Sequence, residues 1–412
     1  MTDLFKIALR NLMRYKRRTL LTASLITIGV VFVLVFMAVS GSFKAMMIGQ
    51  ITDAMLGHIQ IHKKGYVASI DNLPLNLNMK APAVARIEEM IRNQKDIEAS
   101  SPRLKFGGLF SNFNESTNIR LNGIYPDREF KTVPLLTARI TKGKKTLSRG
   151  EIFIPSLLAK GMNIKVGDAI VIIATNKDGS VNGKKFVVAG ILESVTGPGG
   201  RDGYVHIEDA AEVLRMEELE ISEVAIRLKD FDQLQPVFHD LEKKLAAEFT
   251  KDGKSSLEIH TWEGLSPFYN IARMLDIMTF FIKLMLVALV LISVLNVMIM
   301  AVYERIREIG TMAAIGTPPG KIMALFMLEG FSMGVLGTLI GCSVGMLIIY
   351  ILNLAHITFN FGQQQGLLLE AVVHPGALLS ICVIVILVSV LASLEPAFKA
   401  SRMEPITALR HV

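Results

Sequence analysis

Hydrophobic residues are distributed very unevenly along this chain of 412 residues. Four long stretches contain no Asp, Glu, Lys or Arg, namely Thr19 to Phe43, Leu284 to Tyr303, Gly330 to Leu369 and Ala371 to Leu394. A helix needs roughly 20 apolar residues to cross the hydrocarbon core of a bilayer. The pattern therefore predicts four transmembrane helices, at about 20–43, 280–302, 326–352 and 375–394.

The first span follows a basic amino terminus, as the apolar core of a cleavable signal would. Its apolar run is near 20 residues long, whereas signal cores have roughly 7 to 15, and no convincing cleavage site follows Ser40. We therefore expect a retained helix. Within 1–19, apolar residues recur at helical spacing with Lys6 and Arg10 between them. This predicts an amphipathic helix on the inner leaflet, with a simple basic anchor as the alternative.

The segment between the first two spans, 44–267, has short strand-like and helix-like patterns of hydrophobic residues in place of long apolar runs. Gly57 to His62 alternates as a strand does, a helical pattern begins at Pro82, and strand patterns follow from Ile97. Residues 218–262 repeat the order strand, helix, strand, with the helix at Phe231 to Phe249. These patterns predict an α+β extracytoplasmic domain. Its porter-like β-α-β flanks cover about 57–99 and 218–262, and its β-rich middle covers about 100–217, with a hairpin tip near 177–183.

Apolar positions continue at helical spacing upstream of the second span, from Phe268 onward. We therefore expect a stalk that runs into the second transmembrane helix over 268–302. The remaining segments are predicted to be a cytoplasmic coupling helix, an outer loop and a cytoplasmic tail, at 303–320, 353–374 and 395–412.

Composition narrows the class of protein. The chain is 51% hydrophobic and 20% charged, with a mean hydropathy of +0.44. These values exclude a disordered, collagen-like, disulfide-stapled or simple cytosolic protein. Both cysteines, Cys342 and Cys382, lie in predicted spans. The outer domain therefore needs a hydrophobic core of its own.

The distribution of charge gives an orientation. Residues 1–19 hold six Lys or Arg and one acid, Asp3, whereas 353–374 holds no Lys or Arg. The positive-inside rule then predicts cytoplasmic amino and carboxy termini. The segment 44–283 carries 32 basic and 30 acidic residues, so the net charge of +7 falls mostly at the cytoplasmic surface. Anionic headgroups explain this basic cluster better than nucleic acid does.

Five glycines follow a single stripe of the third span, at spacings of three and four residues. Such small-residue stripes let helices approach closely in a membrane. They are consistent with packing inside the bundle or with a subunit contact. Glu329 begins the stripe, and we expect it to cap or pair locally rather than to carry protons. The helix-packing residues are Gly330, Gly334, Gly337, Gly341 and Gly345.

The cytoplasmic loop after the second span reads ERIREIGTMAAIG over 304–316, and Pro318 and Pro319 follow it. Charges precede a short apolar helical face that would fit a groove on a soluble partner. The run resembles the coupling segment of FtsX-like and MacB-like permeases, the mechanotransmission (type VII) class of ABC transporters. The carboxy-terminal PAFKASRMEPITALR, over 396–410, is similar to that family's ending, and the order of one helix, a large outer domain and three helices matches it over the whole chain.

This resemblance implies a non-catalytic permease subunit in the bacterial inner (plasma) membrane, with its large domain in the periplasm. It implies two ABC ATPase subunits that bind ATP and Mg, and a second permease that is identical or homologous. No cofactor is expected in this chain. In size and layout the chain resembles the lipoprotein-releasing permeases of the LolC and LolE type. A lipoprotein and a periplasmic chaperone or adaptor would then be partners, although the hairpin at about 175–185 is shorter than the chaperone-recruiting loop of LolC.

Two other functions fit the same resemblance. One is MacB-like tripartite efflux of drugs, peptides or toxins, and the other is an FtsX-like scaffold that activates a periplasmic cell-wall hydrolase. A Walker A motif is missing, since the spacing and ending around Gly179 and Gly183 are wrong. His58 and His62 share one strand face without a third ligand at an obvious spacing, so we expect a solvated face rather than a metal site. No catalytic arrangement is evident.

Two sets of candidate functional residues follow. The first set would couple the chain to the ATPase through apolar insertion and charge pairs at the rim: Glu304, Arg305, Arg307, Glu308, Ile309, Met312 and Ile315. The second set would line an apolar substrate cavity near the outer leaflet: Phe36, Val39, Phe43, Met47, Met274, Met278 and Phe281.

Overall fold

A computed structural model describes residues 2–194, 201–251, 254–361 and 364–404. The chain divides into two compact units. The helical unit comprises Met1–Lys44, Arg273–Thr358 and Leu368–Val412, and the outer unit comprises Ala45–Ala272 and Phe359–Leu367. Residues 405–412 of the cytoplasmic tail predicted at 395–412 lie outside the described residues.

Four helices of the helical unit are long and apolar enough to cross a membrane. They are α2 (Lys16–Ile51), α10 (Tyr269–Glu304), α12 (Pro319–Leu354) and α13 (Pro375–Ser401). Proline at the first turn starts both α12 and α13, where its missing N–H costs nothing. The helices extend beyond the predicted spans because their ends carry polar residues that still fit a helical backbone.

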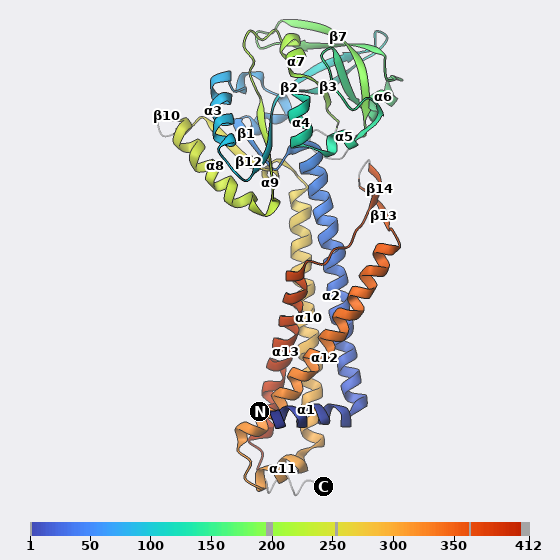
Figure 1. The fold of residues 1–412 in the computed structure, drawn as a ribbon, viewed down its shortest axis with the longest axis vertical. Coiled ribbons are helices and arrows are strands. Elements are labelled where there is room, and N and C mark those ends of the chain that lie inside the picture. Colours follow the sequence, from blue (N-terminus) through green and yellow to red (C-terminus); the bar gives the residue numbers. More distant parts are fainter. Residues whose placement is uncertain (1, 195–200, 252–253, 362–363, 405–412) are drawn as a thin grey trace. The chain divides into compact units, whose positions relative to one another are not determined.

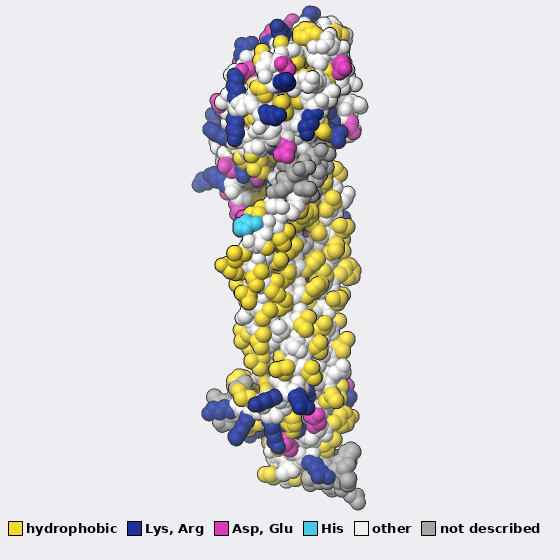
Figure 2. Space-filling model, turned by 90° about the vertical axis from the view of Figure 1, so that its right-hand side faces the viewer, with side chains coloured by type: hydrophobic (Ala, Val, Ile, Leu, Met, Phe, Trp, Pro, Cys, Tyr) yellow, Lys and Arg dark blue, Asp and Glu magenta, His cyan; other side chains and the backbone are white. Residues whose placement is uncertain are grey.

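These helices share one hydrophobic core. It includes Val30 of α2, Val294 of α10, Phe326 of α12 and Val385 of α13, each fully buried. The amphipathic helix α1 (Thr2–Arg14) lies across one end of the unit, near α11 (Ile306–Ala314) (Figure 1). On the face in Figure 2, hydrophobic side chains cover the length of the helical unit, and Lys and Arg gather at that end.

The outer unit is built on a ten-stranded sheet with the order β12-β1-β9-β2-β3-β8-β5-β7-β4, and β6 pairs with β2 and β7. Its strands are β1 (Ile59–Lys63), β2 (Ile97–Ser111), β3 (Ser116–Ile124), β4 (Ile140–Gly143), β5 (Glu151–Pro155), β6 (Ala169–Thr175), β7 (Val181–Leu192), β8 (Gly203–His206), β9 (Glu223–Leu228) and β12 (Leu257–Thr261). The long strand β2 joins the two halves of this sheet. Residues 97–103 pair with β9, and residues 104–111 pair with β3.

Helices cover the sheet where the sequence shows helical periods. Helices α3 (Ala81–Arg92) and α8 (Leu234–Phe249) bury one apolar stripe each, including Ile87 and Leu241. The shorter helical elements are η1 (Thr52–Leu56), η2 (Val67–Asn72), η3 (Leu75–Leu77), α4 (Pro126–Thr132), α5 (Leu135–Ala138), α6 (Ser156–Gly161), α7 (Ile207–Val213), η4 (Phe231–Gln233) and α9 (Trp262–Leu265).

The predicted hairpin is confirmed. Strands β6 and β7 pair in antiparallel register, and Gly179 in the turn has a φ of 84°, which favours glycine. Strand β7 begins at Val181, inside the tip predicted near 177–183, because the ladder with β6 continues to the turn. Two short hairpins were not predicted: β10 (Thr250–Lys251) with β11 (Lys254–Ser255), and β13 (Thr358–Phe361) with β14 (Gln364–Leu368).

Candidate coupling site

The coupling helix α11 is set off from its neighbours by local backbone breaks. Arg305, between α10 and α11, leaves the helical region with φ −115° and ψ 19°. Gly316 follows α11 with a φ of 88°, a conformation that glycine adopts without strain and that commonly ends helices. Pro318 and Pro319 then begin α12. These breaks make α11 a short separate helix between two long ones.

Only part of the predicted apolar face of α11 is available to a partner. Ile309 is 1% exposed and belongs to the core of the helical unit, so the prediction that it inserts into an ATPase is wrong. Met312 also packs against that core, whereas Ile315 is 80% exposed. One side of α11 therefore packs against the long helices of the same chain. Its apolar stripe lies next to their hydrophobic core and is buried against it.

A different stripe of α11 faces outward, and we call it the docking face. Its members are exposed and follow the spacing i, i+4, i+7 and i+8: Arg307, Thr311, Ala314 and Ile315. Thr311 and Ala314 were missed in the sequence because neither is strongly charged or strongly apolar. Their spacing from Arg307 and Ile315 was the available signal.

Arg305 does not point to the rim of α11 but into the protein. Its guanidinium is 5% exposed, and its Nη1 donates to Oε1 of Glu329 on α12 at 2.8 Å. The same Glu329 oxygen accepts from Nδ2 of Asn11 on α1 at 2.7 Å. Nε of Arg305 donates to Glu308 at 2.9 Å. We call these four residues the coupling network, since they join α1, α11 and α12.

The coupling network explains how a carboxylate is tolerated so deep in this unit. Glu329 is fully buried, and an unpartnered charge there would be costly. Burial alone would lower the pKa of Arg305, but Glu329 and Glu308 more than offset it and hold that pKa above its ordinary value. Arg305 therefore stays charged, and it is the ion-pair partner of the buried Glu329 side chain. The predicted local pairing of Glu329 is what the structure shows, and the predicted rim position of Arg305 is wrong.

Two exposed ion pairs join the amino-terminal region to α11 and to the end of α10. Arg14 lies 3.2 Å from Glu308, and Arg18 lies 2.8 Å from Glu304. Exposed pairs of this kind contribute at most about 1 kcal/mol each. Glu304 and Glu308 thus already have partners within this chain.

The glycine stripe of α12 packs against two helices of the same chain. A Cβ on Gly330 or Gly334 would come within 2.6 to 2.8 Å of Ser393 or Ser389 on α13. On Gly337 or Gly341 it would come within 2.6 to 2.8 Å of Ile26 or Val30 on α2, and on Gly345 it would lie 3.0 Å from Leu34. The first two glycines therefore allow close packing of α12 against α13, and the last three allow close packing against α2.

The predicted substrate-lining residues do not form one set. Met47 is fully buried in the core of the outer unit, so its assignment to a substrate cavity is wrong. Phe36, Val39 and Phe43 are partly buried on α2. Exposure is substantial on α10, where the values are 52% for Met274, 43% for Met278 and 60% for Phe281.

A cavity of about 230 Å³ does lie between α2, α10 and the start of α13. Leu34, Met37, Leu275 and Thr279 line it, together with residues before and within α13. At this cavity Nζ of Lys44 lies 2.7 Å from Asp276. The residues that line this cavity lie on α2 and α10, next to the predicted positions but on a different face of each helix. Hydrophobicity alone does not show which face of an all-apolar helix points inward.

His62 of β1 and His58, which directly precedes this strand, are both buried. His58 is 4% exposed and His62 is fully buried, which contradicts the predicted solvent-facing strand. Nε2 of His62 lies 3.4 Å from Glu223, which also pairs with Arg103 and Lys105 at 2.9 Å. This polar face of the sheet is covered by other parts of the outer unit, so the histidines sit among buried ion pairs.

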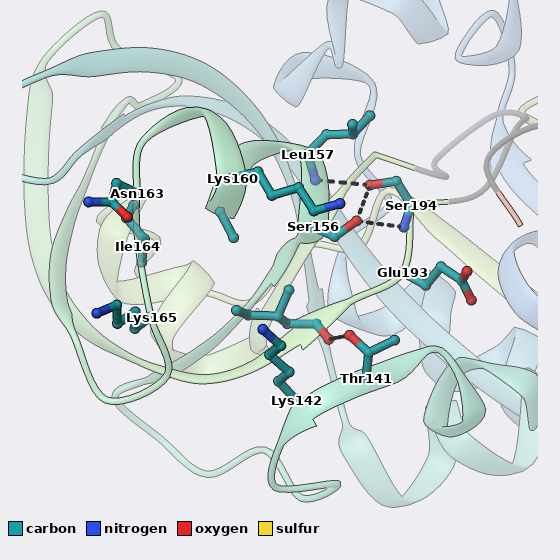
Figure 3. Close-up of a pocket in the computed structure, with 12 residues that line it drawn as sticks. Thr141, Lys142, Ser156, Leu157, Lys160, Asn163, Ile164, Lys165, Glu193 and Ser194 are labelled. Atoms are coloured by element: carbon teal, nitrogen blue, oxygen red, sulfur yellow. Dashed lines mark hydrogen bonds between the residues drawn. The ribbon is translucent and has the colours of Figure 1, made fainter.

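An open pocket of about 580 Å³ lies beside β4, α6 and the end of β7 (Figure 3). Its rim carries the exposed side chains of Lys142, Lys160 and Lys165, and Ile164 and Ile191 supply apolar surface. No local pattern predicts this pocket, since Lys142 on β4 is brought beside Lys160 and Lys165 only by the fold.

Comparisons with known proteins agree with this architecture. A model of the MacB-like periplasmic core domain matches residues 19–244, and a model of the FtsX-like permease C-terminal region matches residues 280–405. The chain is 26% identical to the lipoprotein-releasing system transmembrane protein LolC of Neisseria meningitidis serogroup B, over 98% of each chain.

Two further relatives have other names. The chain is 24% identical to an uncharacterized ABC transporter permease, YknZ of Bacillus subtilis, over 98% of each chain. It is also 24% identical to the macrolide export ATP-binding/permease protein MacB 2 of Aeromonas hydrophila, over 98% of this chain and 60% of the relative. The chain therefore belongs to the ABC transporter permeases of the MacB and FtsX type, membrane subunits that work as dimers with an ATPase.

Proposed function

We propose that this chain is the permease subunit of an ATP-driven transporter that releases lipoproteins or similar amphiphiles from the outer leaflet of the bacterial inner membrane. Separate ATPase subunits would bind ATP and Mg and dock on α11. The docking face, with Glu304 and Glu308 at its edge, is the surface that we assign to this contact. The termini would be cytoplasmic and the outer unit periplasmic, in accord with the basic residues of 1–19.

The coupling network is the observation that carries this proposal. Because Arg305 holds Glu329, a displacement of α11 is transmitted to α12. Helix α12 in turn grips α2 and α13 through its glycines, and α2 supplies residues to both units. Such a series of tight contacts is better suited to mechanical relay across a membrane than to a solute channel.

The substrate class rests on the Neisseria meningitidis relative, which is named for lipoprotein release and matches this chain over 98% of each chain. The test is release of a labelled lipoprotein from proteoliposomes that contain the chain, its ATPase and its second permease. We expect release to require both ATP and this chain. ATP-dependent turnover without any lipoprotein release, in complexes that hold ATPase and permease together, would contradict the proposed substrate.

Export by a MacB-like route is the second candidate, because the MacB 2 relative also matches 98% of this chain. It predicts copurification with a periplasmic adaptor and a change in drug susceptibility when the chain is removed. An FtsX-like scaffold would instead copurify with a cell-wall hydrolase.

A further inference from the structure

An apolar groove lies where α1 turns into α2, at the end of the helical unit opposite the cavity at Lys44. Its volume is about 500 Å³. Its walls come from α2 and α12, and Leu12 of α1 is buried beside them. The residues that line it are Leu12, Lys16, Thr19, Leu20, Ala23, Ser24, Thr27, Ile28, Leu336 and Ile340.

The surface of this groove is apolar although three of its residues carry hydroxyl groups. Thr19 donates to the carbonyl of Leu12, Ser24 to that of Leu21, and Thr27 to that of Gly337. Each hydroxyl is therefore used within the protein, and methyl and methylene groups face the groove. Small side chains at Ala23 and Ser24, between the exposed Leu20 and Ile28, make this surface concave.

The one charged residue of the groove stands at its end. Lys16 is exposed, and among the described residues no acidic side chain forms an ion pair with it, whereas nearby Arg14 and Arg18 pair with Glu308 and Glu304. From Lys16 to Ile28 the helix rises by roughly 18 Å. This length is close to one leaflet of a hydrocarbon core that is roughly 30 Å thick. The groove thus has the length of one acyl chain and a cation at the headgroup end.

We propose that this groove binds an anionic phospholipid of the leaflet that contacts α1, with its phosphate at Lys16 and one acyl chain along Ala23 and Thr27. An anionic lipid is favoured because the exposed Lys6, Arg10 and Arg17 add further positive charge near this end. The lipid would support the corner between α1 and α2, next to the coupling network.

The test uses the full chain with its ATPase in phosphatidylcholine nanodiscs that contain a small fraction of photoreactive lipid. The photoreactive acyl chain is carried either by phosphatidylglycerol or by phosphatidylcholine, and cross-links are mapped by mass spectrometry. We expect labelling of residues 20–28 and 336–340, roughly fivefold stronger with phosphatidylglycerol, as one lysine at an anionic surface would give.

Two variants separate the lipid's chain from its headgroup. Ala23→Phe fills the groove and should remove the labelling, whereas Leu25→Phe, at an exposed position outside the lining, should retain it. Lys16→Gln should reduce the preference for phosphatidylglycerol most strongly, and Lys6→Gln, which lies outside the groove lining, should reduce it less. Retained ATPase binding reports that each variant is folded.

Equal labelling by the two lipids in the unaltered chain would overturn the proposal, as would full labelling in Ala23→Phe. Cross-links from the groove to a second copy of the chain, in place of lipid, would also overturn it.

Discussion

Arg305 and Glu329 form a buried ion pair, 2.8 Å apart, between the start of the coupling helix α11 and the first third of the long helix α12. Both side chains are almost completely shielded from solvent, and Asn11 completes the contact from α1. The pair fixes α11 to α12 at a point where the backbone itself is not helical. It therefore supplies rigidity that the backbone lacks there.

Removing one partner of this pair should be strongly destabilising. We expect Glu329→Gln to lower the free energy of unfolding of the helical unit by about 3–5 kcal/mol, because Arg305 would remain buried and charged. Unfolding in mixed detergent, followed by circular dichroism, measures this. Glu304→Gln, in an exposed pair, should cost at most about 1 kcal/mol. The double variant Arg305→Gln/Glu329→Gln should recover part of the loss; a strictly additive loss would argue against a direct pair.

The docking face should respond to charge at Ile315, which is 80% exposed. We expect Ile315→Glu to reduce copurification of the ATPase at least about tenfold, as loss of one well-packed anchor would. Val166→Glu adds the same carboxylate at an exposed aliphatic position of the outer unit and should have no effect. Ile309→Ala should instead reduce stability, since that side chain is in the core. Normal ATPase binding by Ile315→Glu would remove this face from consideration.

The glycine stripe should not tolerate even one methyl group where α2 packs. A Cβ at Gly341 would lie 2.7 Å from that of Val30, so Gly341→Ala should cost about 1–3 kcal/mol through overpacking. Gly320→Ala lies on the same helix with no atom within 4 Å and is the matched control. Thermal unfolding of both variants in one detergent compares them. Equal midpoints would show that α2 and α12 are not in close contact.

Glu223 should make the stability of the outer unit sensitive to acid. Burial would raise its pKa, but Lys105, His62 and Arg103 hold that pKa well below the ordinary value of about 4.5. The carboxylate therefore adds stability that is complete above about pH 4.5 and is lost as the pH falls toward the lowered pKa.

The matching variant is Glu223→Gln. At pH 7 we expect it to lower the free energy of unfolding by about 3–5 kcal/mol, and the difference should shrink below about pH 4.5. Fluorescence of Trp262, the only tryptophan of the chain and 3% exposed, reports on the outer unit during urea unfolding. Glu217→Gln, at an exposed position, should show neither effect. A difference that grows at low pH would contradict this account.

Two methionines that share one sequence-based assignment should behave differently. Met47→Ala should destabilise the outer unit by about 2–5 kcal/mol, because the residue is fully buried. Met278 is 43% exposed, so Met278→Ala should leave stability unchanged and lower lipoprotein release if it contacts cargo. Met285→Ala, exposed on the same helix, is the control. Equal release by the two exposed variants would remove Met278 from the substrate path.

Local patterns were sufficient to predict most elements of the fold. The strand at β9, the helix at α8 and the hairpin of β6 and β7 were all predicted, because alternation, helical periodicity and turn residues are properties of short segments. The unpredicted hairpin at β13 and β14 lies in a stretch with no clear period.

The candidate site was predicted only in part. The sequence placed α11 correctly, since a short amphipathic run between charges and prolines is a local signal. It could not show that Ile309 and Arg305 turn inward, because Arg305 and Glu329 are 24 positions apart in the sequence and only the fold brings them together. The lysine-rimmed pocket and the buried histidines likewise depend on strands that are distant in sequence.

The sequence by itself determined four apolar helices, an α+β domain after the first of them, and a basic amino-terminal surface. These follow from the length of apolar runs and from period, which need no knowledge of neighbours. The tertiary structure alone decided which side of each helix is buried, which helix packs against each glycine, and which charged side chains form ion pairs. Those outcomes depend on close packing and on desolvation, and both are set by residues brought together from distant parts of the chain.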